Sequence, residues 1–287
     1  MKPRAAEIAA AFEAACLDEL DAPKPGNVHA FADGHRMTAA QFETSAAAAA
    51  APIAQAGTRV GARIEAAVMA TFAAVGVNTN LGIILLCAPL AAAAERGASS
   101  LRAAVAAVLD DLDLEDARHA FSAIVRAAPA GLGRAEQHDV FAPPTVTLRE
   151  AMAAAADRDR IARQYASGFA DIFEVGETNL VRALAAQSHP RWATLAVYIG
   201  FLAAFPDTHI VRKHGPATAR AVQHAAAMFH QRLQSHASAE NLLSELLTWD
   251  AELKRKDINP GTSADLTVAT LFAYRLSTIL PPSSNGG

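Results

Sequence analysis

The chain has 287 residues, 52% hydrophobic and 19% charged, so it is long and apolar enough to bury a sizeable core. Its formal net charge of −4 argues against a non-specific nucleic-acid binder, which normally carries an excess of basic residues. The two cysteines, Cys16 and Cys87, stand far apart in apolar surroundings, which indicates free buried thiols in a reducing cytosol.

The N-terminal segment 1–20 contains several acids and no uninterrupted apolar run, so it does not predict a signal peptide. The longest apolar run, LGIILLCAPLAAAA from Leu81, is shorter than the roughly twenty residues that span a bilayer. We therefore expect a cytoplasmic protein that does not enter a membrane.

Helical periodicity recurs along the chain. Apolar residues repeat at helical spacing in 61–76, 216–234, 238–256 and 264–280, whereas the β-branched and aromatic runs of strands are scarce. The pattern predicts an all-α fold, a single compact domain of roughly ten to twelve helices. We expect this domain to occupy residues 1–280, and the Pro/Ser/Gly-rich end, 281–287, to be a disordered tail.

One long irregular stretch, 131–148, is broken by glycines and by two adjacent prolines. A loop of this length in a compact domain is usually either functional or disordered. Because it holds Glu136, His138 and Asp139, we favour a functional role.

Five polar segments interrupt the alanine-rich background, each at the edge of a predicted helix. They are KPGNVH (24–29), GVNTNLG (76–82), GRAEQHD (133–139), DTHIVRKHG (207–215) and KDINPGTSADL (256–266). Helix N-termini present unpaired N–H groups and a partial positive charge, which suit phosphate oxygens. We therefore predict that these segments meet around one pocket for a phosphorylated sugar.

The segment 207–215 allows two interpretations. As a short helix closed by Gly215, it places Arg212 and Lys213 in the last turn, where positive charge simply favours the helix dipole. That interpretation leaves Asp207 and His209 unexplained. Because carboxylate and imidazole suit Mg²⁺ or proton transfer, and arginine and lysine suit phosphate, we favour a functional site.

Several well-known motifs are absent, namely GxxxxGK[ST], GxGxxG, HExxH and GxSxG. His138-Asp139 is reminiscent of helical metal phosphohydrolases, although chance alone supplies about half of one such dipeptide in a chain of this composition. A metal phosphohydrolase therefore stays open as an alternative. So does a non-catalytic helical scaffold, in which the polar segments are only helix caps.

Taken in order, four pieces of the chain resemble the triphosphoribosyl-dephospho-CoA synthase family. The pieces are PKPGNV (23–28), ATFAAVGVNTNLG (70–82), FPDTHIVRKHGPATARAVQ (205–223) and INPGTSADLTVATLF (258–272). The resemblance implies an all-helical transferase that takes ATP and 3'-dephospho-CoA, releases adenine and joins a 5-triphosphoribosyl group to the acceptor ribose by an α-linkage.

The chain departs from the family's motifs in two places. The synthases typically read GVNTHKG and GGSADL, whereas here Asn80 and Leu81 replace the His and Lys, and Thr262 replaces the second Gly. The donor and the acceptor therefore stay open. The NTNL form is similar to a shorter branch of the family from methane-producing archaea and methylotrophs. Phosphoribosyl transfer in tetrahydromethanopterin biosynthesis, a part of one-carbon metabolism, is thus an alternative role.

Transfer of a phosphorylated ribosyl group requires charge neutralisation, leaving-group stabilisation and deprotonation of an acceptor hydroxyl. By residue type and segment, we predict catalytic roles for Asp207, His209, Asp265 and Glu65, with Mg²⁺ bound by Asp207 and Asp265. The predicted substrate-binding residues are Lys24, Asn27, Asn78, Asn80, Glu136, Arg212, Lys213, His214 and Ser263. We expect ATP as a substrate and small phosphorylated molecules as the partners. The oligomeric state stays open, a homodimer included.

Overall fold

The computed structural model describes residues 4–98, 100–129, 133–186, 188–235 and 239–280. Within them the chain forms thirteen α-helices and one π-helix, η1, and no strand beyond two isolated bridges. The all-α prediction is confirmed, with slightly more helices than expected. The elements are α1 (Ala5–Asp21), α2 (Ala39–Ile53), α3 (Val60–Val75), α4 (Leu81–Arg96), α5 (Leu101–Asp110), α6 (Leu114–Ala127), α7 (Leu148–Ala155), α8 (Arg160–Ser167), η1 (Asp171–Gly176), α9 (Glu177–Ala185), α10 (Pro190–Ala204), α11 (Thr208–Gln234), α12 (Ala239–Arg255) and α13 (Gly261–Ile279).

Local capping chemistry explains where many of these helices begin. Thr38, Asp113 and Thr147 each precede a helix, and each side chain accepts a hydrogen bond from an N–H group of the first turn. Alanine, the best helix former, fills most helix interiors and allows close packing between helices. The sequence thus sets the helix starts locally.

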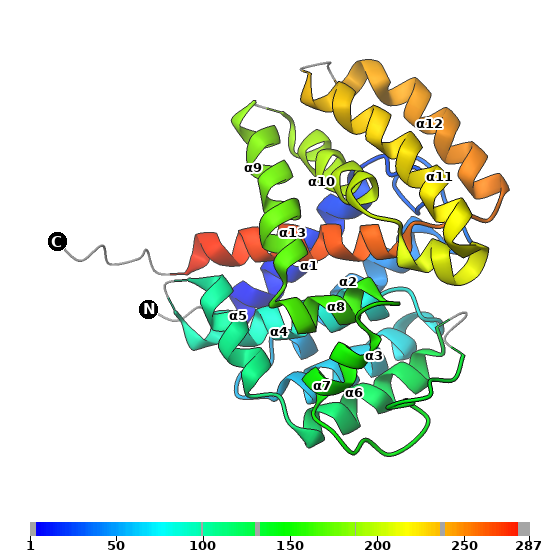
Figure 1. The fold of residues 1–287 in the computed structure, drawn as a ribbon. Helices are drawn as coiled ribbons and strands as arrows, with labels where there is room; N and C mark the ends of the chain where they lie inside the picture. The colour runs from blue at the N-terminus through cyan, green and yellow to red at the C-terminus, as the bar shows by residue number, and fades with distance from the viewer. Residues whose placement is uncertain (1–3, 99, 130–132, 187, 236–238, 281–287) are drawn as a thin grey trace.

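The C-terminal helix α13 is the centre of the fold. It packs against α1, α4 and α10, with α2 to α8 on one side and α9 to α12 on the other (Figure 1). Buried residues occur on all sides of α13, as expected of a helix enclosed by others. The N-terminal end of α13 therefore lies among the ends of several other helices.

The apolar interior is divided into two clusters. The larger surrounds α4 and α13 and includes Phe12, Ile84 and Phe272. The smaller joins α10, α11 and α12 through residues such as Tyr198 and Leu246, and it also includes Ala264 of α13. The pair formed by α11 and α12 therefore has apolar packing of its own against α10, and we call these three helices the upper lobe.

Helix α11 is interrupted near its start. Gly215 has φ 81° and ψ 165°, outside helical values, so that 208–214 and 216–234 are two helical pieces joined at a kink. The predicted end of a short helix at Gly215 is confirmed. The first piece carries the basic residues of the 207–215 segment.

Other expectations fare as follows. Cys16 and Cys87 are free cysteines, and only Cys87 is fully buried, whereas Cys16 is half-buried. In the described part of 131–148, no helix forms before Leu148. The predicted tail 281–287 lies outside the described residues.

No single helix among the described residues is long and apolar enough to cross a bilayer. Two pairs of consecutive helices, α4 with α5 and α10 with α11, reach that length and apolar character when the two helices are taken together, but each pair is sharply bent.

Candidate active site

Asp207 joins the beginnings of two helices. Its Oδ1 accepts hydrogen bonds from the backbone N–H groups of His209 (2.9 Å) and Ile210 (3.1 Å), which caps α11. Its Oδ2 accepts from the N–H and the hydroxyl of Ser263, both at 2.8 Å, in the first turn of α13. Burial raises the pKa of this fully enclosed carboxyl, while the four hydrogen bonds act in the opposite direction. Both carboxylate oxygens are thus occupied within the protein.

Two threonines connect a third helix to this point. The Thr208 hydroxyl accepts a hydrogen bond from the N–H of Arg160 (3.2 Å) at the start of α8, and it hydrogen bonds to the Thr262 hydroxyl (3.0 Å). Asp159 caps α8 through the N–H groups of its first turn. The N-termini of α8, α11 and α13 therefore lie together.

Asp265 brings in a fourth helix. An ideal Cβ placed on Gly82, in the first turn of α4, would lie only 2.0 Å from Asp265 Oδ2, so the carboxylate occupies the space that this glycine leaves. We call this meeting point of α4, α8, α11 and α13 the N-terminal junction. Four helix N-termini meet there, and each contributes a partial positive charge of the kind that suits phosphate oxygens, while the Asp159 and Asp207 carboxylates cap two of them.

The carboxyl group of Asp265 stands at the centre of the junction without a hydrogen-bond partner among the described residues. It is half-buried, and no described residue donates a hydrogen bond to its carboxylate. Burial raises its pKa well above the usual range. The negative charges of Glu19, Asp207 and Asp159 add to this effect, and the positive charge of Arg212 opposes it.

His209 lies on the other side of the start of α13. An ideal Cβ on Gly261 would be 2.4 Å from the imidazole Nδ1, so this ring also fills space left by a glycine. Burial, together with the positive charges of Arg212 and Lys213, lowers the pKa of His209 to about 4. The ring is therefore neutral near pH 7, and no described residue hydrogen bonds to it.

Basic side chains follow His209 along α11. Arg212 lies 3.5 Å from Asp159, and Lys213 lies 3.4 Å from Asp257. The ring of His214 donates a hydrogen bond to the Asp257 carbonyl (2.9 Å). The contacts of Lys213 and His214 with Asp257 lie at the surface, where such contacts contribute little to stability.

Lys24 is fully buried. Its ammonium group donates to the carboxylate of Glu19, to Asn27 Oδ1 (3.0 Å) and to the Val28 carbonyl (2.8 Å). All three of its protons are thus committed to the protein, an arrangement that favours a structural role over phosphate binding. Burial lowers the pKa of Lys24, and the charge of Glu19 opposes the shift.

Asn27 connects this buried lysine to the loop before α13. Its amide nitrogen donates to Asn259 Oδ1 (2.8 Å). The preceding Gly26, at φ 82°, packs so tightly that an ideal Cβ would lie 2.8 Å from Pro260 Cδ. The segments 24–29 and 256–266 therefore pack directly on each other, as predicted, and fix the position of the α13 N-terminus.

The asparagines before α4 have local partners. Asn78 Oδ1 accepts from the N–H of Leu81 (3.1 Å), and the amide of buried Asn80 lies 3.5 Å from the Ser45 carbonyl. They shape the start of α4 beside Gly82. Asn80 and Leu81 therefore bring no charged side chain to the junction.

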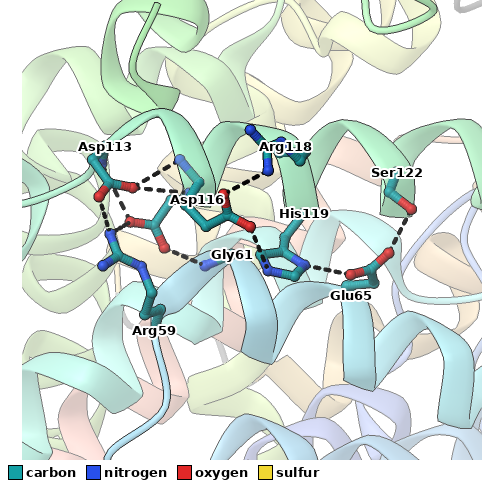
Figure 2. Close-up of polar contacts among 9 residues, drawn as sticks. Arg59, Gly61, Glu65, Asp113, Asp116, Arg118, His119 and Ser122 are labelled. Carbon is teal, nitrogen blue, oxygen red and sulfur yellow. Dashed lines mark hydrogen bonds and ion pairs between the residues drawn. The ribbon is translucent and has the colours of Figure 1, made fainter. Parts of the chain in front are cut away.

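Glu65 belongs to a separate polar cluster between α3 and α6 (Figure 2). It accepts hydrogen bonds from His119 Nδ1 and the Ser122 hydroxyl, both at 2.5 Å. Burial opposes ionisation, but these two bonds prevail and lower the pKa of Glu65. Among the described residues, the hydrogen bonds of Glu65 go to α6 and none goes to a residue of the junction.

The segment 133–139 does not join the junction either. Glu136 is exposed. Asp139 accepts hydrogen bonds from the N–H groups of Ala135 (3.1 Å) and Phe141 (2.9 Å), which hold its own loop. His138 and Asp139 share no metal-binding group with a third His, Cys, Asp or Glu in the described chain. This arrangement gives the phosphohydrolase alternative no support.

The predicted magnesium site can be examined by the same criterion, the grouping of metal-binding side chains. In the part of the chain that the structure describes, no three His, Cys, Asp or Glu side chains are grouped to hold a metal ion. The oxygens of Asp207 are already filled by four donors, which leaves Asp265 alone. The residues present do not fit a metal site made by the protein, and we derive no step through Mg²⁺.

One small cavity borders the junction, and a larger one lies away from it. A crevice of about 10 Å³ between α1, α2 and α4 is lined by Glu19 and Asn80 among others. A wider cleft of about 340 Å³, at the start of α3, is lined by Arg59, Arg63 and Arg96. Each of these arginines is paired with a carboxylate, which leaves no excess of charge for a ligand.

Comparison with known proteins bears on the whole chain. The family model described as ATP:dephospho-CoA triphosphoribosyl transferase matches residues 5–283. The chain belongs to this family. The resemblance seen in the four sequence pieces is thereby confirmed, and the protein is a transferase.

A solved structure from Archaeoglobus fulgidus, provisionally assigned as a triphosphoribosyl-dephospho-CoA synthase, shares the fold with a TM-score of 0.61. The two sequences are 23% identical, and the similarity covers 84% of this chain and 99% of that one. No curated protein matches the chain.

Three junction residues escaped the sequence analysis. Asp159 stands directly before an apolar periodic run, an N-cap signal that could have been noticed. Glu19 and Asp257 gave no such signal, because their roles depend on contacts with Lys24 and Lys213 that only the fold creates.

Proposed function

We propose that this transferase moves the triphosphoribosyl group of ATP to a 3'-dephospho-CoA acceptor and releases adenine. Family membership supports the reaction class. The observation that carries the proposal is the N-terminal junction, where four helix starts and the basic residues Arg212 and Lys213 surround Asp265 and His209.

In this proposal the triphosphate of ATP lies against the helix starts, where the partial positive charge of the helix N-termini and the guanidinium group of Arg212 offset its charge. The ribose carbon then lies near Asp265 and gains oxocarbenium character as its bond to adenine breaks. The two asparagines before α4 and Ser263 of α13 shape the site around the sugar. A magnesium ion would arrive with the substrate phosphates.

The test is direct incubation of the protein with ATP and 3'-dephospho-CoA. We expect one adenine released per acceptor consumed, seen by chromatography, and a product whose mass equals the acceptor plus a triphosphoribosyl group. Arg212→Ala should raise KM for ATP at least tenfold, since a charge-assisted phosphate contact contributes about 1.5–3 kcal/mol. The matched control is Arg220→Ala, which removes an exposed arginine from the same helix. Absence of adenine release by the wild-type protein would refute the proposed donor.

A donor with a single phosphate on the ribose C5 is a second candidate, favoured by one observation. Asn80 and Leu81 are both buried and uncharged, so the start of α4 supplies no cation for a third phosphate. Incubation with phosphoribosyl pyrophosphate in place of ATP tests this candidate, because its transfer releases pyrophosphate. Equal or faster turnover with that donor would favour it over ATP.

A further inference from the structure

Two ionisable side chains in the junction, Asp265 and His209, have no hydrogen-bond partner among the described residues. Each lies in space that a glycine provides, Asp265 against Gly82 and His209 against Gly261. Neither glycine could carry even a methyl group without displacing the side chain, since the ideal Cβ atoms lie 2.0 and 2.4 Å from the carboxylate and the ring. The fold thus makes room for both groups without using them to hold itself together.

The two groups occupy the same stripe of α13. Gly261, which the imidazole covers, and Asp265 are four residues apart, so they lie one turn apart on one face of the helix. Four residues of an α-helix rise about 6 Å along its axis. A sugar ring placed over that turn would have the carboxyl group at one end and the imidazole at the other.

Their electrostatic surroundings are opposite. Asp265 interacts electrostatically with the carboxylates of Glu19 on α1, Asp159 before α8 and Asp207 before α11, and with the cations Arg212 and Lys24. His209 lies near the cations Arg212 and Lys213 and near the imidazole rings of His35 and His214. Burial raises the pKa of Asp265 and lowers that of His209, and the charged neighbours of each group act in the same direction, so that the two pKa values move apart from their ordinary values in opposite directions.

We propose that Asp265 donates a proton to the departing base of the nucleotide donor and that His209 accepts the proton of the acceptor hydroxyl. The inference rests on the proposed function. The bond between the ribose C1' and the base nitrogen breaks, and the base leaves with the electron pair and takes the Asp265 proton. The acceptor oxygen forms the new bond to C1' and loses its proton to His209. Exchange with water then returns a proton to Asp265 and removes one from His209.

The first experiment compares two donors in the wild-type protein and needs no variant. With ATP, kcat/KM should fall at low pH as His209 is protonated, and at high pH as Asp265 loses its proton. With a 4-nitrophenyl β-riboside 5-triphosphate, whose leaving group needs no protonation, the high-pH fall should disappear and the low-pH fall should remain. A high-pH fall that is the same for both donors would overturn the acid role.

The second experiment uses variants. Asp265→Asn should reduce turnover of ATP at least a hundredfold, the usual contribution of a general acid, and stay within about tenfold of wild type on the nitrophenyl donor. His209→Gln should reduce turnover of both donors at least a hundredfold. Matched controls are Asp157→Asn and His224→Gln, which change exposed residues beside α8 and on α11.

The outcomes separate the two proposals. Wild-type protein that releases no adenine refutes the proposed function, and the acid–base assignment falls with it. Wild-type protein that releases adenine while Asp265→Asn loses equal activity on both donors, or His209→Gln keeps wild-type turnover, refutes the acid–base assignment alone. Thermal unfolding of each variant confirms that the measured loss comes from a folded protein.

Discussion

Replacement of the buried Lys24 by methionine should destabilise the protein strongly. The substitution leaves the Glu19 carboxylate enclosed with its charge unpaired, and it removes the donors to Asn27 and to the Val28 carbonyl. Loss of one member of a buried ion pair costs about 3–5 kcal/mol. The unfolding entropy is about 2.1 cal/mol/K per residue, or about 0.6 kcal/mol/K for a chain of this length, so Tm should fall by about 5–8 °C.

The assay is thermal unfolding of Lys24→Met followed by circular dichroism, with urea unfolding as a second measure. Lys256→Met is the matched control, because Lys256 pairs with Glu252 at 2.6 Å on the exposed surface of α12 and just beyond it, and its Tm should change by about 1 °C at most. Adding Glu19→Gln to Lys24→Met should recover part of the loss, because the orphaned charge is then removed.

A role for Lys24 in binding substrate phosphate would give a different result. If Lys24 contacted substrate phosphate, as its residue type predicted, Lys24→Met would keep the wild-type Tm and raise KM for ATP. A Tm within about 1 °C of wild type would therefore refute the reasoning from the buried pair.

Three further changes give separate predictions. Asp265→Asn should raise Tm at pH 8 and leave Tm unchanged near pH 3. Because the pKa of Asp265 is raised in the folded protein, its carboxyl group destabilises the fold increasingly as the pH rises from the ordinary pKa near 3.8 to the folded-state pKa, and asparagine removes this cost. Gly26→Ala should lower stability by about 2–4 kcal/mol in urea unfolding, from its positive φ and the contact with Pro260; an unchanged midpoint would contradict the close packing seen there. Glu65→Gln should leave kcat within about twofold of wild type, because its partners lie between α3 and α6; a hundredfold loss of turnover would restore it as a catalytic residue.

Local sequence patterns predicted much of the fold. Alanine content and apolar spacing predicted the helices, and Gly215 with Pro216 predicted the break in α11, because each depends on a few neighbouring residues. The number of helices was underestimated. Short elements such as α7 and α8 span only two turns, which is too little for periodicity to distinguish them from a loop.

The sequence predicted which segments form the candidate site better than it predicted what each residue does there. The segments around Asp207, Ser263 and Asp265 do meet, but residue type could not show that Asp207 has every acceptor position filled by helix ends. The same holds for Lys24, whose partners are set by tertiary packing. Residue type predicts what a group can do, whereas burial and competing partners decide whether it is available to a ligand.

The upper lobe has a consequence for how the site comes apart. Its apolar cluster is distinct from the larger one and includes one residue of α13, Ala264, so we expect α11 and α12 to detach together while the rest of the central helix stays folded. Such a detachment carries His209 and Arg212 away from Asp265. Amide protons of α11 and α12 should then exchange with solvent together, and earlier than those of α4, and substrate bound at the junction should slow that exchange.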